Sequence, residues 1–449
     1  MKTPIYDFVK SYSESNTVRA HMPGHKGRLF LGCENIDITE IKGADELYCP
    51  DGIISESENN ASALFKTAHS FYSTGGSTLA IYAMVSLVCR SQKNPAILAA
   101  RNVHKAFIHA CALVGCDIEW IYPKQFTHIC ECIVSAESIE NSLKYADKPI
   151  TAVYLTSPDY LGNIQDIKSI SEVCKKYKLP LMVDNAHGAY LGFLKKSMHP
   201  IALGADMCCD SAHKTLPALT GAAYLHISKN APSEFVKNSR TELSVFSSTS
   251  PSYLILQSLD LLNKYLSESF SEEIESCTEK VRMLKKRLSE KGYDILNNEP
   301  LKITVNASSV GMTGFELAEL IRSSKIEPEY SDREYLVLML TPQNLKSDFM
   351  RIENSFPALQ KSSSPIHRLD IRNYPIPKKA IGIREAVFSE FETIRTSDSL
   401  GRICAAPTVS CPPAVTPIVS GEVINSEIIK ILEFYGIDKI KVLTQNNNF

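Results

Sequence analysis

The stretch ITAVYLTSPDYLGNIQDIKSISEVCKKYKLPLMVD, residues 150–184, decides the fold of this chain. Its β-branched first part, Ile150–Leu155, predicts a strand, and Pro180–Asp184 predicts a second strand that ends on an acid. Between them, residues 164–179 place their apolar side chains on one helical face, which predicts an amphipathic helix. A strand, a helix and a strand in this order indicate two parallel strands of one sheet.

The same alternation of helices and strands runs from about Thr78 to His226. We predict helices at residues 78–90 and 104–115, and short strands at residues 96–100, 117–122, 205–210 and 222–227. Strands separated by helices indicate an α/β fold, with a mostly parallel sheet that helices cover on both faces. Ligands of such sheets bind beyond the carboxyl ends of the strands, so polar residues at those ends are candidate site residues.

The length and composition are those of a globular protein with several domains. A chain of 449 residues is too long for one ordinary core and suggests two or three domains. The net charge of −2 gives no electrostatic case for nucleic acid or an anionic membrane as a partner. The sequence has no apolar run of signal-peptide or membrane-spanning length, so we expect a cytoplasmic protein. Its 13 cysteines are scattered without zinc-site spacing, so we expect reduced thiols and no metal site.

Changes in sequence character suggest how the chain is divided. We expect an amino-terminal segment at residues 1–55, a large site-bearing domain at 56–265, a small α/β domain at 266–360 and a carboxy-terminal domain at 361–449. Strands at residues 301–308 and 334–340 should surround a helix at 313–325 in the small domain. A serine-rich linker is expected at residues 362–365, followed by a helix at 382–395 and a last helix from Ser426.

The segment YSTGGSTLAIYA, residues 72–83, places two glycines and two hydroxyl residues directly before a helix. The free amides at a helix start, together with the hydroxyls of Ser77 and Thr78, form a ready site for an anion. The alternative is a plain loop in which a serine caps the helix. Gly76 and Ser77 are therefore candidate phosphate-binding residues.

Asp184 ends a predicted strand and is followed by small residues and His187. A carboxylate in that place caps a helix, binds a metal or pairs with a cation, and opposite a pyridine nitrogen it would keep that nitrogen protonated. His187 is placed to reach the same ring or a substrate carboxylate. His104 also follows a predicted strand, where a single histidine more often has a structural role.

The stretch DSAHKTLPALTGAAYLH, residues 210–226, carries Lys214 just after a predicted strand. Taken alone, Lys214 could be one more solvated charge. A lysine that forms an imine needs a dry, confined site, which a buried strand and the neighbouring His213 would supply. Ser211 and His213 are placed to reach a phosphate. A hydroxyl-rich helix start, a histidine, a strand-end aspartate and a lysine, in this order, are the groups that bind pyridoxal 5′-phosphate (PLP).

The stretches that carry a family resemblance run nearly from end to end, at residues 21–27, 44–54, 73–80, 101–106, 156–167, 183–193, 210–226, 247–260, 326–332 and 412–424. On these stretches, among them HMPGHKG and VDNAHGAYLGF, the sequence resembles the bacterial ornithine/lysine/arginine decarboxylases, which are PLP-dependent. The resemblance implies the fold of aspartate aminotransferase (fold type I), with a seven-stranded, mostly parallel sheet in the large domain and a smaller α/β carboxy-terminal domain. It implies a short form without the amino-terminal wing domain of the larger members, and a homodimer.

The resemblance also assigns roles to single residues by motif. Lys214 would hold PLP as an imine, Asp184 would pair with the ring nitrogen, and His104 would stack on the ring. Ala186 would pack against the other ring face, with His187 beside it. The residues that would hold the phosphate are Gly76, Ser77, Ser211 and His213. Ser250 would contribute across the dimer, near the active site.

The chain departs from the family pattern at several positions. Thr74, Gly76 and Ala106 replace residues that are usual around the cofactor. The late block Cys411–Thr416 and the nearby Ser420 differ most, close to where the family reads its substrate. Because of this block, the sequence does not choose among lysine, arginine and ornithine.

The resemblance predicts decarboxylation of one of these amino acids to CO2 and a polyamine-type amine. Glu422 is a candidate partner for the basic side chain of the substrate, and the alternative is a capping role before the last helix. Two other functions stay open: another fold-type-I enzyme such as an aminotransferase, and a non-catalytic relative that binds a cofactor or a partner.

Overall fold

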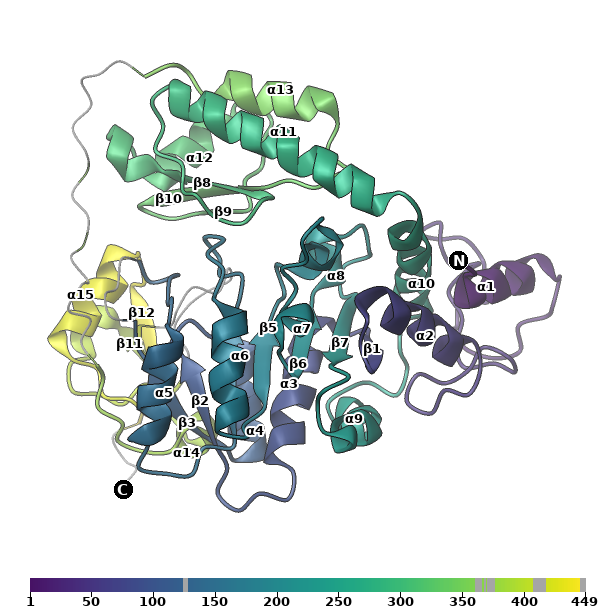
Figure 1. The fold of residues 1–449 in the computed structure, drawn as a ribbon, viewed down its shortest axis with the longest axis horizontal. Helices are drawn as coiled ribbons and strands as arrows, with labels where there is room; N and C mark the ends of the chain where they lie inside the picture. Colours follow the sequence, from purple (N-terminus) through teal and green to yellow (C-terminus); the bar gives the residue numbers. More distant parts are fainter. Residues whose placement is uncertain (124–127, 360–365, 367–368, 370–375, 407–416, 445–449) are drawn as a thin grey trace. The chain divides into compact units, whose positions relative to one another are not determined.

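The computed structural model describes residues 1–123, 128–359, 366, 369, 376–406 and 417–444 (Figure 1). The chain forms two compact units. The first unit comprises residues 1–92, 151–154 and 167–273, and the second comprises residues 93–150, 155–166 and 274–449. The expected linker at residues 362–365 lies outside the described residues.

A seven-stranded sheet has the strand order β1-β7-β6-β5-β4-β2-β3. The pairs β2–β3 and β5–β6 are parallel, whereas β7 runs antiparallel to both of its neighbours, β6 and β1. The prediction of an α/β fold with a mostly parallel sheet is therefore confirmed. The strands are β1 (His69–Ser73), β2 (Ala96–Ala100), β3 (Asp117–Ile121), β4 (Ala152–Thr156), β5 (Leu181–Asp184), β6 (Met207–Asp210) and β7 (Ala223–Ile227).

Most of the helices near these strands lie where the apolar periodicity predicts them. The predicted helix at residues 78–90 is α3, which is buried over most of its surface, and the one at 104–115 is α4, which ends at Gly115 in the left-handed conformation. The helices of the first unit are α1 (Pro4–Glu14), α2 (Ile53–Phe65), α3 (Gly76–Cys89), α6 (Ile167–Lys176), α7 (Pro200–Leu203), α8 (Ala212–Thr215), α9 (Ser233–Val245) and α10 (Tyr253–Glu268), with the 3-10 turn η1 (Ala189–Phe193). In the second unit, α4 (Lys105–Val114) and α5 (Ala136–Lys144) accompany β2 and β3.

The second unit also contains the predicted smaller α/β arrangement. A three-stranded antiparallel sheet has the order β8-β10-β9. A Cβ atom on Gly314 would lie 2.0 Å from the carbonyl oxygen of Tyr335, so only glycine lets α12 begin this close to β10. The elements are α11 (Phe270–Glu290), β8 (Lys302–Asn306), η2 (Ala307–Val310), α12 (Gly314–Arg322), β9 (Tyr330–Ser331), β10 (Tyr335–Met339) and α13 (Lys346–Ser355).

The carboxy-terminal part corrects one prediction. The expected helix at residues 382–395 is wrong in its second half, because α14 (Ile383–Phe388) ends early and β11 (Phe391–Arg395) follows. The sequence FETIR is rich in β-formers and pairs antiparallel with β12 (Lys439–Leu443), which gives its backbone groups partners. The last helix, α15 (Ser426–Phe434), begins where predicted, after the short turn η3 (Thr396–Asp398).

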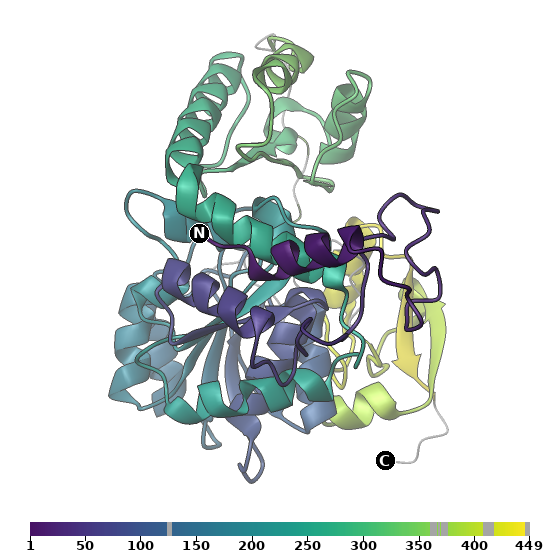
Figure 2. The same cartoon turned by 90° about the vertical axis from the view of Figure 1, so that its right-hand side faces the viewer.

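A buried polar cluster joins the amino-terminal helix to the first unit. Asp260 of α10 is fully buried, and its carboxylate accepts hydrogen bonds from the backbone N–H groups of Ile5 (2.9 Å) and Tyr6 (3.0 Å) at the start of α1. It also accepts one from the hydroxyl of Ser57. No side chain of α1's own cap bonds these amides, so α10 caps α1 from outside. Figure 2 shows the purple α1 alongside the teal α10.

The substitution Asp260→Ala should destabilise the first unit. It leaves two helix-start amides and one hydroxyl without their acceptor, at a cost of about 1–3 kcal/mol. The measurement is the midpoint of chemical denaturation, followed by circular dichroism. The control is Glu14→Gln, at an exposed position of the same helix α1, which should leave the midpoint unchanged. Equal midpoints for both variants would show that Asp260 does not anchor α1.

Candidate active site

The end of β5 carries Asp184, which is 4% exposed. One of its oxygens, Oδ1, accepts a hydrogen bond from the backbone N–H of Ala186 at 3.1 Å, which turns the chain sharply after the strand. The other, Oδ2, accepts from the hydroxyl of Tyr154 at 3.4 Å. Asp184 pairs in register with Cys209 of β6, so these two strands end at the same edge of the sheet. The predicted place of the carboxylate, at the end of a buried strand, agrees with the structure.

The turn after β5 meets the short helix α8 that follows β6. Nζ of Lys214 lies 3.1 Å from Nε2 of His187, which is 5% exposed, while Lys214 is partly buried. An amine and an imidazole at hydrogen-bonding distance share a proton, so this pair is suited to giving or taking one. The structure thus brings together Lys214, the predicted imine-forming lysine, and His187, the histidine predicted beside the ring.

The start of α3 has the features of an anion site. Its N-cap residue, Gly75, offers no side chain to the first helical amides. Gly76 has φ +67°, and nothing lies within 4 Å of the place where a Cβ would be. Ser211, the N-cap of α8, donates from its hydroxyl to that of Ser77 at 2.8 Å. The two hydroxyls therefore come from two different elements and meet beside a helix start without a side-chain cap, which suits a phosphate.

Two other predicted residues have partners of their own. Nδ1 of His213 lies 2.9 Å from the carbonyl oxygen of Ala222, and burial together with Lys214 holds the pKa of His213 below its ordinary value. His104 is the N-cap of α4, where its Nδ1 accepts the N–H of Ala106 at 3.1 Å. His104 belongs to the second unit, so its stacking on a ring bound to the first unit stays a prediction.

Glu422 binds Arg101, whereas the sequence suggested that it binds a basic substrate or caps the last helix. Its carboxylate binds the guanidinium of Arg101 through two contacts of 2.8 and 2.6 Å, and both side chains are buried, at 4% and 0% exposure. It also accepts the N–H of Val419 at 2.9 Å. Its charge is therefore already neutralised within the protein, which argues against Glu422 as the partner of a basic substrate. The capping role is wrong as well, because Asn425 caps α15.

Arg101 is the residue that sequence reasoning missed. It is fully buried, and its guanidinium lies over the ring of Trp120, the one tryptophan of the chain, at 4.7 Å. The signal was an arginine directly after the apolar strand β2, since a buried cation needs a carboxylate. The late block Cys411–Thr416, by contrast, lies outside the described residues.

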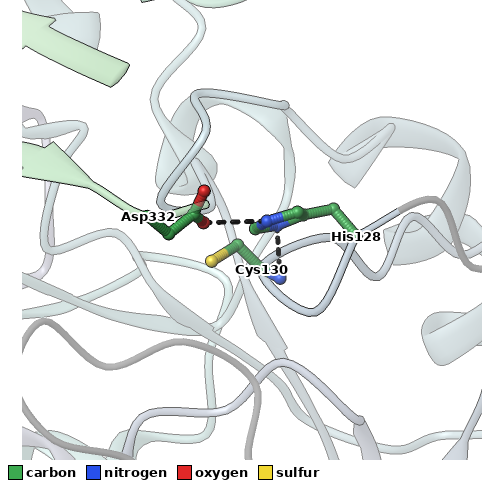
Figure 3. A group of neighbouring side chains, drawn as sticks. All are labelled: His128, Cys130 and Asp332. Atoms are coloured by element: carbon green, nitrogen blue, oxygen red, sulfur yellow. Dashed lines mark hydrogen bonds and ion pairs between the residues drawn. The ribbon is translucent and has the colours of Figure 1, made fainter. Parts of the chain in front are cut away.

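Among the described residues, two groups combine histidine, cysteine and aspartate as metal sites do: His128–Cys130–Asp332 and His199–Cys208–Asp210. In the first, Nε2 of His128 lies 2.8 Å from Oδ2 of Asp332, and Nδ1 accepts the N–H of Cys130 at 3.1 Å (Figure 3). Two ligand atoms of one tetrahedral zinc would lie about 3.3 Å apart. The shorter distance between His128 and Asp332 is that of a buried ion pair. Burial raises the pKa of Asp332, but the contact with His128 holds this pKa below its ordinary value.

Solved structures share this fold. The crystal structure of the lysine decarboxylase LdcF of Francisella novicida superposes with a TM-score of 0.79 at 18% identity, over 98% of this chain and 81% of that chain. Lysine decarboxylase A from Pseudomonas aeruginosa gives a TM-score of 0.81 at 15% identity, over 98% and 80%. The chain thus has the fold-type-I architecture.

Sequence relatives identify the family. The profile of the family described as Orn/Lys/Arg decarboxylase, major domain, matches residues 3–304, and the chain belongs to this family. An arginine decarboxylase of Bacillus subtilis is 29% identical over 96% of this chain and 93% of its own length. The uncharacterized protein YaaO of the same organism is 29% identical over 96% and 94%. Among the described residues, no helix is long and apolar enough to cross a membrane.

The substitution Glu422→Gln should destabilise the second unit strongly. It leaves the guanidinium of Arg101 buried without a counter-charge, which costs about 3–5 kcal/mol. The measurement is the denaturation midpoint of the variant. The control is Glu279→Gln, which breaks the exposed pair with Arg282 and should leave the midpoint unchanged. If Glu422→Gln unfolds no earlier than Glu279→Gln, the buried pair does not stabilise the second unit.

Proposed function

We propose that this protein is a PLP-dependent decarboxylase that converts a basic amino acid, arginine, lysine or ornithine, to the corresponding amine and CO2. The observation that carries the proposal is the contact of 3.1 Å between Lys214 and His187 at the sheet edge where Asp184 ends β5. Membership of the Orn/Lys/Arg decarboxylase family supports it.

The donor groups at this edge fit PLP. Gly76, Ser77 and Ser211 supply an uncapped helix start and two hydroxyls for the phosphate. Asp184 supplies a buried carboxylate for the ring nitrogen, and Lys214 supplies the amine for the covalent link. Ala186 lies in the turn after β5 and His213 lies in α8, while His104 would stack on the ring from the second unit.

The residues of the chain would share the chemistry as follows. Bound PLP supplies an electron sink for the bond between Cα and the carboxylate. Asp184 would hold the proton on the ring nitrogen, because an anionic carboxylate stabilises the protonated form of a nearby nitrogen. The contacts of its oxygens with Ala186 and Tyr154 orient it. Lys214 or His187 would return a proton to Cα after CO2 leaves. Burial of Asp184 and His187 keeps water away from these proton transfers.

Arginine is the first substrate to test. The relatives named arginine decarboxylases come from Bacillus subtilis, Bacillus anthracis and Bacillus cereus, at 26–29% identity over most of both chains. Lysine is the second, because the solved structures of similar fold include lysine decarboxylases, although such likeness concerns the fold. Ornithine completes the set that the family description prints.

We further propose a cytoplasmic homodimer with its active site near the subunit boundary, a cofactor-binding domain at residues 56–265, and neither nucleic acid nor membrane as a partner. Leu29, Phe30 and Leu31 support a protein interface, since they are 68%, 92% and 84% exposed in the single chain. Ser250 is exposed as well, as its predicted contribution across the dimer requires.

Lys214→Ala should abolish the visible absorption band of lysine-bound PLP and lower CO2 release at least about a hundredfold, since it removes both the covalent link and one proton donor. The measurements are the absorption spectrum of the purified protein and labelled CO2 release. Lys229→Ala, at an exposed lysine after β7, is the control and should retain both. A wild-type protein that takes up no added PLP would refute the proposed cofactor.

A panel of carboxyl-labelled arginine, lysine and ornithine identifies the substrate. We expect CO2 from one of the three with a kcat/KM at least about tenfold above the others, because a cation placed one or two methylenes away misses its acceptor. The same panel with an α-keto acid detects the competing reaction. Transfer of the amino group without CO2 would show an aminotransferase instead.

A further inference from the structure

A second aspartate, Asp210, ends β6 and is fully buried directly before Ser211 and α8. Its carboxylate is the meeting point of three side chains from other elements. Oδ1 accepts the amide Nδ2 of Asn185 at 2.6 Å. Oδ2 lies 3.0 Å from Nε2 of His199 and 3.2 Å from Nε2 of His226. All of these residues belong to the first unit.

The two imidazoles keep this carboxylate charged. Burial opposes the charge, but His199 and His226 hold the pKa of Asp210 below its ordinary value. The other nitrogen of His226, Nδ1, bonds the hydroxyl of Ser70 in β1 at 2.8 Å, and Ser70 in turn bonds the hydroxyl of Thr67 at 2.7 Å. Asp210 is thus held from two sides by residues whose own positions are fixed.

The distances within this group are those of a hydrogen-bonded network. The distance of 3.0 Å between Asp210 and His199 is that of a hydrogen bond. Sγ of Cys208, the third possible ligand, lies 3.9 Å from Nε2 of His199, and burial raises the pKa of its thiol well above the ordinary value.

Asp210 contacts both chain segments that carry the candidate site, the turn after β5 and the start of α8. At the end of β6 it directly precedes Ser211 and the helix of Lys214. Its carboxylate also binds the side chain of Asn185, the residue between Asp184 and Ala186. Oδ1 of Asn185 is buried without a partner among the described residues, so the contact to Asp210 is what orients this amide. The backbone N–H of Asn185 bonds the carbonyl oxygen of Cys209 at 3.0 Å, which ties the same turn to β6.

We propose that Asp210 is a positioning residue for the cofactor, which sets the turn of Asp184 and Ala186 relative to Lys214 through Asn185. The inference rests on the proposed PLP site. Asn185 is bonded covalently to both neighbours, so a fixed Asn185 restricts the positions that Asp184 and Ala186 can take in the turn after β5. A loop that carries a ring-binding carboxylate must be held this rigidly, because small displacements of a site residue weaken binding strongly.

The test uses two variants of the full-length protein. Asp210→Asn keeps the shape of the side chain. It replaces a carboxylate, which accepts hydrogen bonds with both oxygens, by an amide that has one acceptor and one donor group. Asn185→Ala leaves the charged network intact and removes only its link to the turn. For both, we expect the dissociation constant of PLP to rise at least about tenfold, as the loss of one buried hydrogen bond to a charged group predicts. The visible circular dichroism of bound PLP should weaken too, because it reports how the ring is held.

Asp260→Asn is the matched control, a buried carboxylate of the first unit that caps α1 instead. It should lower the melting temperature while the affinity for PLP and the dichroic band stay those of the wild type. If Asn185→Ala binds PLP with wild-type affinity and band, Asp210 does not position the cofactor, whether or not Asp210→Asn folds. Zinc bound in stoichiometric amount and lost in Asp210→Asn would also overturn the network. If the wild type itself binds no PLP, the proposed function fails first, and this inference with it.

Discussion

The parallel pairing of β5 with β6 is the constraint on which the candidate site depends. It places Asp184 in register with Cys209, so both strands end at one edge and their following loops must meet there. The loop after β5 brings His187, and the helix after β6 brings Lys214 to within 3.1 Å of it. The start of α3 reaches the same place through the contact of Ser77 with Ser211. The pairing of β5 with β6 thus brings together His187 and Lys214, and the pairing of β1 with β7 precedes α3, whose Ser77 contacts Ser211 from 134 residues away.

Three buried aspartates of the first unit, Asp260, Asp210 and Asp184, are stabilised in different ways, and the differences follow the use of each residue. Asp260 accepts from backbone amides and a hydroxyl, which suits a fixed anchor. Asp210 faces two imidazoles and an amide, so its charge is fully used inside the protein. Among the described residues, Asp184 accepts one backbone amide at 3.1 Å and two weaker donors at 3.4 and 3.5 Å. These contacts orient the carboxylate and leave it capacity to accept a further strong donor, as a protonated ring nitrogen would be.

The sequence was sufficient for features that depend on local pattern and failed for those that depend on contact between distant residues. Apolar runs and helical periodicity located β2, β5, α3 and α15 within a few residues, because the buried face of each element requires apolar residues at nearby, regularly spaced positions. The stretch Phe391–Arg395 was expected to be helical although it is rich in β-formers. Its partner strand lies nearly fifty positions further along, so the local sequence does not reveal the pairing that makes it a strand. The pairing of Arg101 with Glu422, 321 residues apart, was beyond reach for the same reason.

That buried pair also bears on what the substrate will require. Arg101 shows how this chain satisfies a guanidinium out of water: two contacts with one carboxylate and an aromatic face at 4.7 Å. An arginine substrate needs the same planar fork of acceptors, whereas the ammonium of lysine or ornithine needs a point acceptor at a fixed distance. Asp184, Lys214 and His187 would act near Cα, where the three amino acids are identical. The choice among them must therefore come from other residues than Glu422, whose carboxylate is already committed to Arg101.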